Sequence, residues 1–199
     1  MRILIVTEAF LPQVNGVTNS VLRLLEYCKR EGHEVLVIAP ESVNAPQDYL
    51  GFKIKYVPSI AMKKLIPMGL PKKYLEPFIE GFNPDVIHLA SPMLLGMHGA
   101  KVAKKLDIPT LSVYQTDMAG FASHYGFDIA HSSLRKLVGK IHSQTDRTLA
   151  PSRSACLELK SQGVPEVYLW QRGVNNELFH PNKRSESLRK YWDPTGKKT

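Results

Sequence analysis

The first 40 residues read MRILIVTEAFLPQVNGVTNSVLRLLEYCKREGHEVLVIAP and predict one strand–helix–strand unit. Ile3–Val6 is a continuous apolar run, as expected of a strand covered on both faces of a sheet. Apolar residues then recur at three- and four-residue steps, which predicts an amphipathic helix over residues 17–31 that Gly32 ends. Val35–Ala39 is a second buried strand. Because a helix separates the two strands, we expect them to pair in parallel.

The same alternation continues along the chain. Strands are predicted at 54–57, 86–89, 110–113, 148–150 and 167–169, and helices at 95–105, 132–143 and 153–162. Strands that alternate with helices over this length imply an α/β fold with a doubly wound, mostly parallel Rossmann-like sheet. We expect one domain over residues 1–182. A basic linker or tail follows over residues 183–199, with a short helix at 184–192.

The composition is that of an ordinary globular protein with a basic surplus. Hydrophobic residues make up 43% of the 199 residues, and the formal net charge is +8. Residues 183–199 carry six basic and two acidic residues, so half of the net charge lies there. A basic surplus favours phosphate-bearing partners. No zinc-finger spacing or RNA-binding aromatic signature is present, which argues against nucleic acid.

Several features bear on the compartment. No apolar stretch has the length of a membrane span or of a signal-peptide core. Cys28 and Cys156 lie in predicted helices without metal-ligand spacing, so we expect both to be reduced, in a cytoplasmic protein.

The loop after the first strand leads into a helix that begins near Asn15 and Gly16. Ligands of doubly wound sheets lie beyond the carboxyl ends of the strands, where unpaired helix N–H groups attract phosphate. We therefore consider Asn15, Gly16, Val17 and Thr18 as phosphate contacts. The alternative is an ordinary helix start. The spacing Gly-x-Gly-x-x-Gly and the P-loop pattern are both missing, which argues against an NAD site and a P-loop.

The loop after residues 110–113 is rich in polar groups, among them Gln115, Thr116, Asp117 and His124. Such groups at the carboxyl end of a strand suit a hydroxyl-rich ligand such as a sugar. Asp117 could orient a hydroxyl or act as a base, and His124 could act as an acid or a base. The alternatives are a turn capped by Asp and Thr and a structural, hydrogen-bonded histidine.

Other polar residues have plainer interpretations. Arg172 and Gly173 follow the strand at 167–169 and could contact a phosphate, although a salt bridge within the domain would also explain the arginine. Ser152 is most simply a helix cap. His88 lies inside a strand, where a buried neutral imidazole is expected. No histidine pair has metal-ligand spacing, and no Gly-x-Ser-x-Gly elbow is present.

Residues 61–82 mix lysines with large apolar groups. Lys63, Lys64, Lys72 and Lys73 would suit the surface of an anionic bilayer. The alternative is a loop followed by an amphipathic helix that packs on the sheet.

Taken together, the loops carry a specific resemblance. The motifs, in chain order, are Ile3-Leu4-Ile5-Val6-Thr7-Glu8…Pro12…Asn15-Gly16-Val17, Pro84-Asp85-Val86-Ile87-His88, Tyr114-Gln115-Thr116-Asp117, Ala150-Pro151-Ser152 and Arg172-Gly173-Val174-Asn175-Asn176-Glu177-Leu178-Phe179-His180-Pro181. Their order and spacing resemble the amino-terminal half of family 4 glycosyltransferases over essentially the whole chain. The nearest resemblance is to bacterial GDP-mannose-dependent α-mannosyltransferases.

The resemblance implies a GT-B enzyme of two facing Rossmann-like domains, of which this chain is the acceptor-side one. It implies a retaining transfer without a required metal or other cofactor, from a nucleotide-sugar such as GDP-mannose to a lipid or glycolipid. Carried over by position, Asn15 to Thr18 with Arg172 and Gly173 would contact the donor diphosphate. Gln115 to Asp117 would lie near the sugar and acceptor. Tyr114 and the four lysines would lie towards the acceptor and the inner face of the plasma membrane.

Three departures from the family pattern are evident. Many relatives have His where Gln115 stands, and an amide cannot transfer a proton. Many have Asp where Asn175 stands. The chain also stops where the carboxyl-terminal donor-binding domain should begin, so we expect half an enzyme without transfer activity of its own. Two alternatives stay open: a silent binding module for an anionic lipid or phosphosugar, and a family member with a UDP-glucose or UDP-sulfoquinovose donor.

Overall fold

The computed structural model describes residues 1–60, 68–69, 74–115, 128–171 and 173–195. An eight-stranded sheet with the order β10-β9-β8-β7-β1-β2-β4-β3 forms its centre. These strands are β1 (Arg2–Thr7), β2 (Glu34–Pro40), β3 (Asp48–Tyr49), β4 (Phe52–Val57), β7 (Val86–Ala90), β8 (Thr110–Val113), β9 (Arg147–Ala150) and β10 (Val167–Leu169). All pair in parallel except β3, which runs antiparallel to β4. The predicted doubly wound parallel sheet is confirmed.

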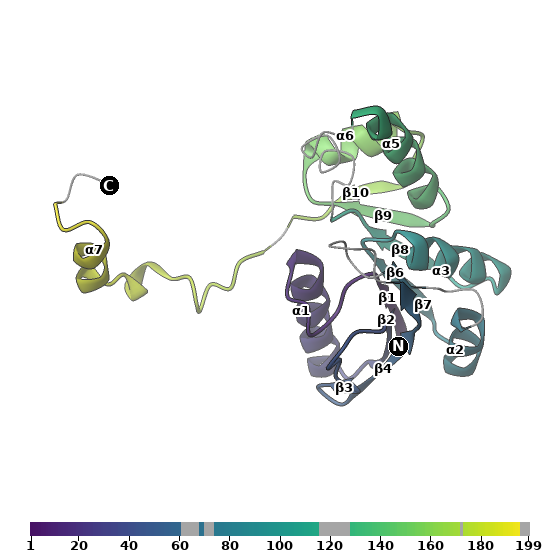
Figure 1. The fold of residues 1–199 in the computed structure, drawn as a ribbon, viewed down its shortest axis with the longest axis horizontal. Coiled ribbons are helices and arrows are strands. Elements are labelled where there is room, and N and C mark those ends of the chain that lie inside the picture. The colour runs from purple at the N-terminus through teal and green to yellow at the C-terminus, as the bar shows by residue number, and fades with distance from the viewer. Residues whose placement is uncertain (61–67, 70–73, 116–127, 172, 196–199) are drawn as a thin grey trace.

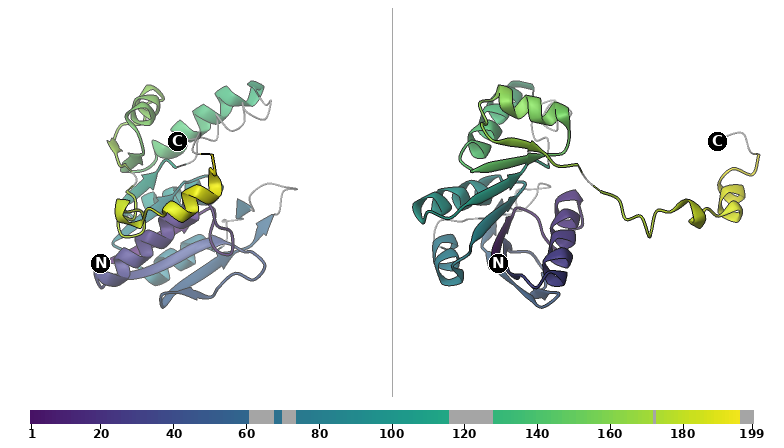
Figure 2. Two further views of the ribbon diagram at one scale, coloured as in Figure 1. Left: turned by 90° about the vertical axis from the view of Figure 1, so that its left-hand side faces the viewer. Right: turned by 180° about the vertical axis from the view of Figure 1, so that it is seen from behind.

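Helices cover both faces of this sheet (Figure 1). They are α1 (Gly16–Arg30), α2 (Leu75–Phe82), α3 (Leu94–Lys105), α5 (Asp128–His142) and α6 (Arg153–Ser161), and a further helix, α7 (Glu186–Trp192), lies beyond the sheet. Figures 1 and 2 show α1 on one face of β1 and β2, with α2 and α3 on the opposite face.

The core follows from the alternation of side chains along the central strands. In β1, Leu4 and Val6 pack towards α2 and α3, whereas Ile5 packs towards α1. Leu25 and Cys28 of α1 are fully buried on the Ile5 side, so Cys28 is a packed thiol. Burial of this kind contributes roughly 1.5–3 kcal/mol for each large aliphatic side chain. Both layers therefore hold β1 firmly at the centre of the sheet.

The strand order reverses beside β1, and this feature positions the candidate site. β1 pairs with β2 on one side and with β7 on the other, so that Ile5 lies opposite both Val37 and His88. The crossovers that leave β1 and β7 therefore lie on opposite faces of the sheet. In doubly wound folds the ligand binds at such a switch point, outside the carboxyl ends of the strands.

A few elements escape or extend the sequence-based prediction. Three strands have only two residues each and are too short to show periodicity: β3, β5 (Ser59–Ile60) and β6 (Met68–Gly69). β5 and β6 pair with each other in antiparallel orientation. Helix α5 begins at Asp128, four residues before its predicted start. Within residues 61–82, α2 buries Leu75 and Ile79 against the sheet, as the packed-helix alternative required.

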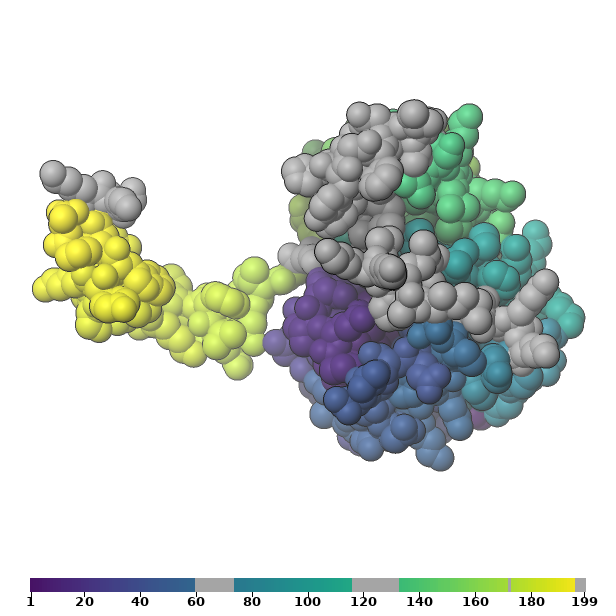
Figure 3. All heavy atoms as spheres, in the orientation of Figure 1, coloured from purple at the N-terminus to yellow at the C-terminus, as the bar shows by residue number. Residues whose placement is uncertain are grey.

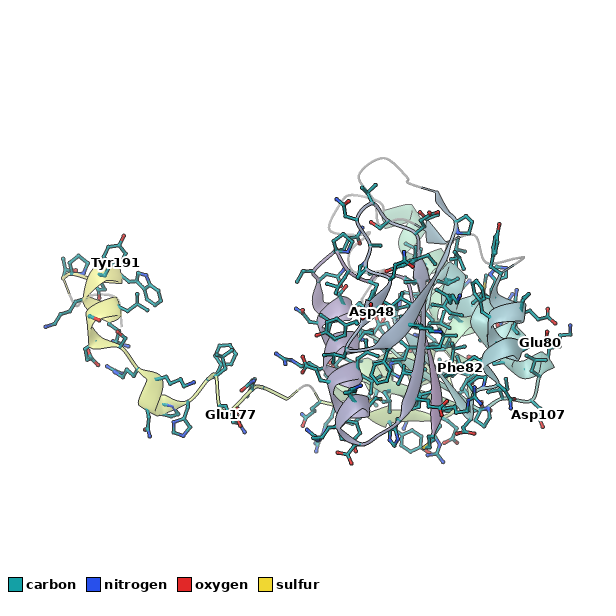
Figure 4. The ribbon with its side chains drawn as sticks, turned by 90° about the horizontal axis from the view of Figure 1, so that it is seen from below. Asp48, Glu80, Phe82, Asp107, Glu177 and Tyr191 are labelled. Atoms are coloured by element: carbon teal, nitrogen blue, oxygen red, sulfur yellow. The ribbon has the colours of Figure 1, made fainter. Side chains whose placement is uncertain are left out.

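Beyond β10 the chain leaves the body of the domain (Figures 1 and 3). Residues 173–195 are almost entirely exposed, and α7 confirms the short helix predicted there. Figure 4 shows Glu177 and Tyr191 of this segment well away from the sheet. Among the described residues, no helix is both long enough and apolar enough to span a bilayer.

Candidate functional site

The candidate site lies at the carboxyl edge of the sheet, where α1 begins. Asn15 is the N-cap residue of α1, and its side-chain Oδ1 accepts hydrogen bonds of 2.9 Å from the N–H groups of both Val17 and Thr18. Because these two donors already have an acceptor, Asn15 serves first as a helix cap. The exposed residue Gly16 supplies the remaining donor. Its N–H has no intrahelical partner and no acceptor among the described residues.

Thr18 lies one turn inside this helix end and is buried. The residue is 0% exposed, and its hydroxyl Oγ1 has no hydrogen-bond partner among the residues that the structure describes. An unpaired buried hydroxyl is uncommon in folded proteins. Val17 packs partly against the core beside α1. Of the four residues predicted to contact phosphate, Gly16 is therefore the one whose backbone N–H is exposed and has no acceptor within the described part of the chain.

The segment after β8 lies two strands away from β1. Tyr114 is only 8% exposed, and its ring meets the edge of the His142 ring at a centroid distance of 5.8 Å. Its N–H donates to the carbonyl of Leu149 in β9 at 2.8 Å. Tyr114 is therefore largely buried where β8 ends, and the half-buried Gln115 follows it.

Several of the predicted site residues lie outside the described residues: Lys63, Lys64, Lys72, Lys73, Thr116, Asp117, His124 and Arg172. Gly173 is described and exposed, and a Cβ atom added to it would meet nothing within 4 Å. It begins the segment that leaves the domain on the face of the sheet covered by α1 (Figures 1 and 2). The structure thus brings Asn15 to Thr18 together at one helix end.

Glu8 is a buried acidic residue at this edge to which the sequence analysis gave no role. It follows β1 directly, is 8% exposed, and its Oε1 accepts hydrogen bonds from Met93 N at 2.8 Å and Gly96 N at 2.9 Å. Burial raises the pKa of its carboxyl group, against the opposing effect of these backbone donors. An acidic residue at the carboxyl end of a buried strand was the signal available in the sequence.

A buried polar network joins β8, β9 and the end of α5. Ser112 Oγ lies 2.9 Å from His142 Nδ1, 2.9 Å from Thr145 Oγ1 and 3.0 Å from Thr148 Oγ1. Burial lowers the pKa of His142 to about 4, so its ring is neutral near pH 7. Because Ser112 is 0% exposed, this serine–histidine pair has no access to a substrate, and its hydrogen bonds join β8 to β9 and to the end of α5.

The structure also settles two of the plainer interpretations. Burial lowers the pKa of His88 to about 4, which confirms a neutral imidazole inside β7. Ser152 Oγ accepts from Ala155 N at 3.1 Å and caps α6, as predicted. Across the described ranges, no group of three or more His, Cys, Asp or Glu residues could hold a metal ion.

Comparisons with known proteins agree with this architecture. The profile of Glycosyltransferase Family 4 matches residues 14–178. The chain is 44% identical to a GDP-mannose-dependent alpha-mannosyltransferase of Corynebacterium glutamicum, over 100% of this chain and 49% of that protein. It is 46% identical to a protein of the same name from Mycolicibacterium smegmatis, over 99% of this chain and 54% of that one.

A solved structure of a glycosyltransferase from Rickettsia africae matches with a TM-score of 0.60 and 17% identity, over 98% of this chain and 51% of that one. Sucrose-phosphate synthase from Thermosynechococcus elongatus matches with a TM-score of 0.61 and 13% identity, over 90% of this chain and 50% of that one. These neighbours support the GT-B type of fold. The chain spans about half the length of the curated relatives it matches. From the profile match and the two mannosyltransferase relatives, the chain belongs to glycosyltransferase family 4.

Proposed function

We propose that this chain is the acceptor-side domain of a retaining mannosyltransferase that uses GDP-mannose and a lipid or glycolipid acceptor. The observation that carries the proposal is the exposed N–H of Gly16 at the switch point of the sheet, for which the described residues supply no acceptor. The similarity to two GDP-mannose-dependent alpha-mannosyltransferases supports the choice of donor. The reaction needs no metal in this proposal.

The proposed role of Gly16 is to bind the donor diphosphate. A helix N-terminus carries a partial positive charge, and a free N–H there is a directed donor for a phosphate oxygen. Negative charge grows on the diphosphate as it departs. A fixed dipole aimed at that charge stabilises the transition state more than the bound substrate. The absence of a side chain on Gly16 lets a phosphate approach the backbone closely.

The proposed role of Gln115 is to hold a sugar hydroxyl. Its amide can donate and accept hydrogen bonds but cannot take up a proton at neutral pH, so it positions the sugar or acceptor without acid–base catalysis. The neighbouring Thr116 and Asp117 belong to the same proposed region by sequence. Arg172 with Gly173 would meet the diphosphate from the exit segment. The four lysines of residues 61–73 would face an anionic membrane surface at the cytoplasmic side.

The test is a donor and acceptor screen with the full-length protein, next to the 199-residue polypeptide. GDP-mannose, UDP-glucose and UDP-sulfoquinovose are offered with lipid acceptors, and product is followed by radiolabel from the sugar. The proposal expects turnover with GDP-mannose. Turnover with a UDP-sugar alone would refute the mannose assignment. Lipid binding by the full-length protein without turnover on any donor would favour the binding module.

A further inference from the structure

Helices α1, α3 and α6 each follow a strand of the parallel sheet and begin at its carboxyl edge, where their first backbone N–H groups lie. Helix α1 is capped by Asn15, and α6 is capped by Ser152. Helix α3 differs, because its N-cap residue Met93 makes no side-chain cap bond. Its donors are met instead by Glu8, which is 85 residues away in sequence from Met93.

The contacts of Glu8 are closely fitted. One oxygen, Oε1, accepts hydrogen bonds from the N–H groups of both Met93 and Gly96. A Cβ atom at Gly96 would lie 2.3 Å from Pro92 Cβ, so the close packing of this helix start against Pro92 requires the glycine, and the same Cβ would be in ordinary contact with Glu8 Oε1 at 3.8 Å. A carboxylate at a helix N-terminus occupies the position that a phosphate oxygen of a ligand would otherwise take.

The same residue also stands where the chain passes from β1 towards α1. Glu8 begins the loop of residues 8–15, which ends at the cap of α1. Within that loop Ala9 and Phe10 are buried, and Thr7 Oγ1 donates to Ala9 O at 2.8 Å. The crossover on the other side of the switch point is α3. Within the described chain, the hydrogen bonds from this loop to α3 are those that Glu8 accepts.

We propose that Glu8 is a positioning residue: its carboxyl group fills the anion-binding end of α3 and ties the loop of residues 8–15 to that helix, which leaves Gly16 as the phosphate donor at the switch point. The inference rests on the proposed function for the role of Gly16. The occupancy of α3 by Glu8 stands on its own contacts. Glu8 acts through Gly16 and does not touch the substrate.

The test compares the wild-type chain with Glu8→Ala and Glu8→Gln by thermal unfolding. Loss of the acceptor should lower the Tm of Glu8→Ala by about 4–8 °C. Glu8→Gln keeps an oxygen acceptor and should recover most of that loss. Added formate should raise the Tm of Glu8→Ala but not that of wild type, because the small anion can enter the vacated end of α3. A merely space-filling role of Glu8 would not respond to formate.

The second readout is amide resonances during titration with inorganic pyrophosphate. In wild type the Gly16 amide should shift and those of Met93 and Gly96 should not, whereas in Glu8→Ala the latter two should shift as well. A shift of Gly96 in wild type, or no formate response in Glu8→Ala, would overturn the inference. If Glu8→Ala does not fold, the test rests on Glu8→Gln. In that variant the Gly96 amide resonance should not shift during the pyrophosphate titration, and a shift would overturn the inference.

The outcomes separate the two proposals. A Gly16 amide that is silent in every variant refutes the diphosphate site and with it the steering role of Glu8. Formate rescue in that case would still support the occupancy of α3 by the carboxyl group.

Discussion

Gly16→Pro is the sharpest perturbation of the proposed diphosphate site, because it removes one N–H group and disturbs little else. Gly16 is the first residue of α1, where the N–H has no intrahelical partner and proline is well tolerated. The preceding residue, Asn15, has extended backbone with φ −146° and ψ −178°, which suits a residue before proline. The Asn15 cap bonds go to Val17 and Thr18 and do not involve the deleted group.

The magnitude follows from the kind of bond that is lost. A hydrogen bond to a charged phosphate contributes about 1.5–3 kcal/mol. Its loss should lower kcat/KM for GDP-mannose by roughly 10- to 100-fold in the full-length protein. The Tm should stay close to that of wild type, since the helix keeps its cap.

Gly16→Ala is the matched control, because it adds a methyl group and keeps the N–H. The assay measures kcat and KM for GDP-mannose in all three proteins, with thermal unfolding alongside. We expect the alanine variant to lose less activity than the proline variant. Equal losses would show that bulk at this position matters rather than the donor. An unchanged kcat/KM in Gly16→Pro would refute the reasoning.

Two further predictions concern stability. Gly96→Ala should destabilise the chain by about 1–3 kcal/mol in denaturant unfolding, because the added Cβ would lie 2.3 Å from a neighbouring side-chain carbon and overpack the site. Gly81→Ala, at an exposed position of α2, is the control and should be neutral or stabilising. Equal effects of the two substitutions would contradict the packing. His88 and His142 each have a pKa of about 4 in the folded chain, so the unfolded state takes up protons first as the pH falls. Each should then lower the free energy of unfolding by about 3 kcal/mol. Stability should therefore fall between pH 6.5 and pH 4, and an unfolding free energy that is flat over this range would contradict the burial.

Much of the fold could be predicted because local patterns and the global sheet agree. Ile3–Val6 and Val35–Ala39 became β1 and β2 with margins of one residue, since buried parallel strands are continuous apolar runs. β3 could not be found, because two residues that pair at a sheet edge carry no periodicity. Its position depends on the partner strand β4 rather than on its own sequence.

The candidate site was predictable where local chemistry decides it. Asn15 followed by Gly16 marks a helix start, and the structure places the cap there. The same amide that suits a phosphate also caps the helix, so the sequence did not reveal that Asn15 is already engaged. Glu8 was missed for a different reason. Its partners Met93 and Gly96 are brought to it by the pairing of β1 with β7, a contact between distant parts of the chain.

The most direct measurement is a crystal structure of the full-length protein with GDP bound. The account predicts a diphosphate oxygen within hydrogen-bond distance of Gly16 N, at about 2.9 Å. A bound diphosphate whose oxygens all lie beyond hydrogen-bond reach of Gly16 N would contradict it.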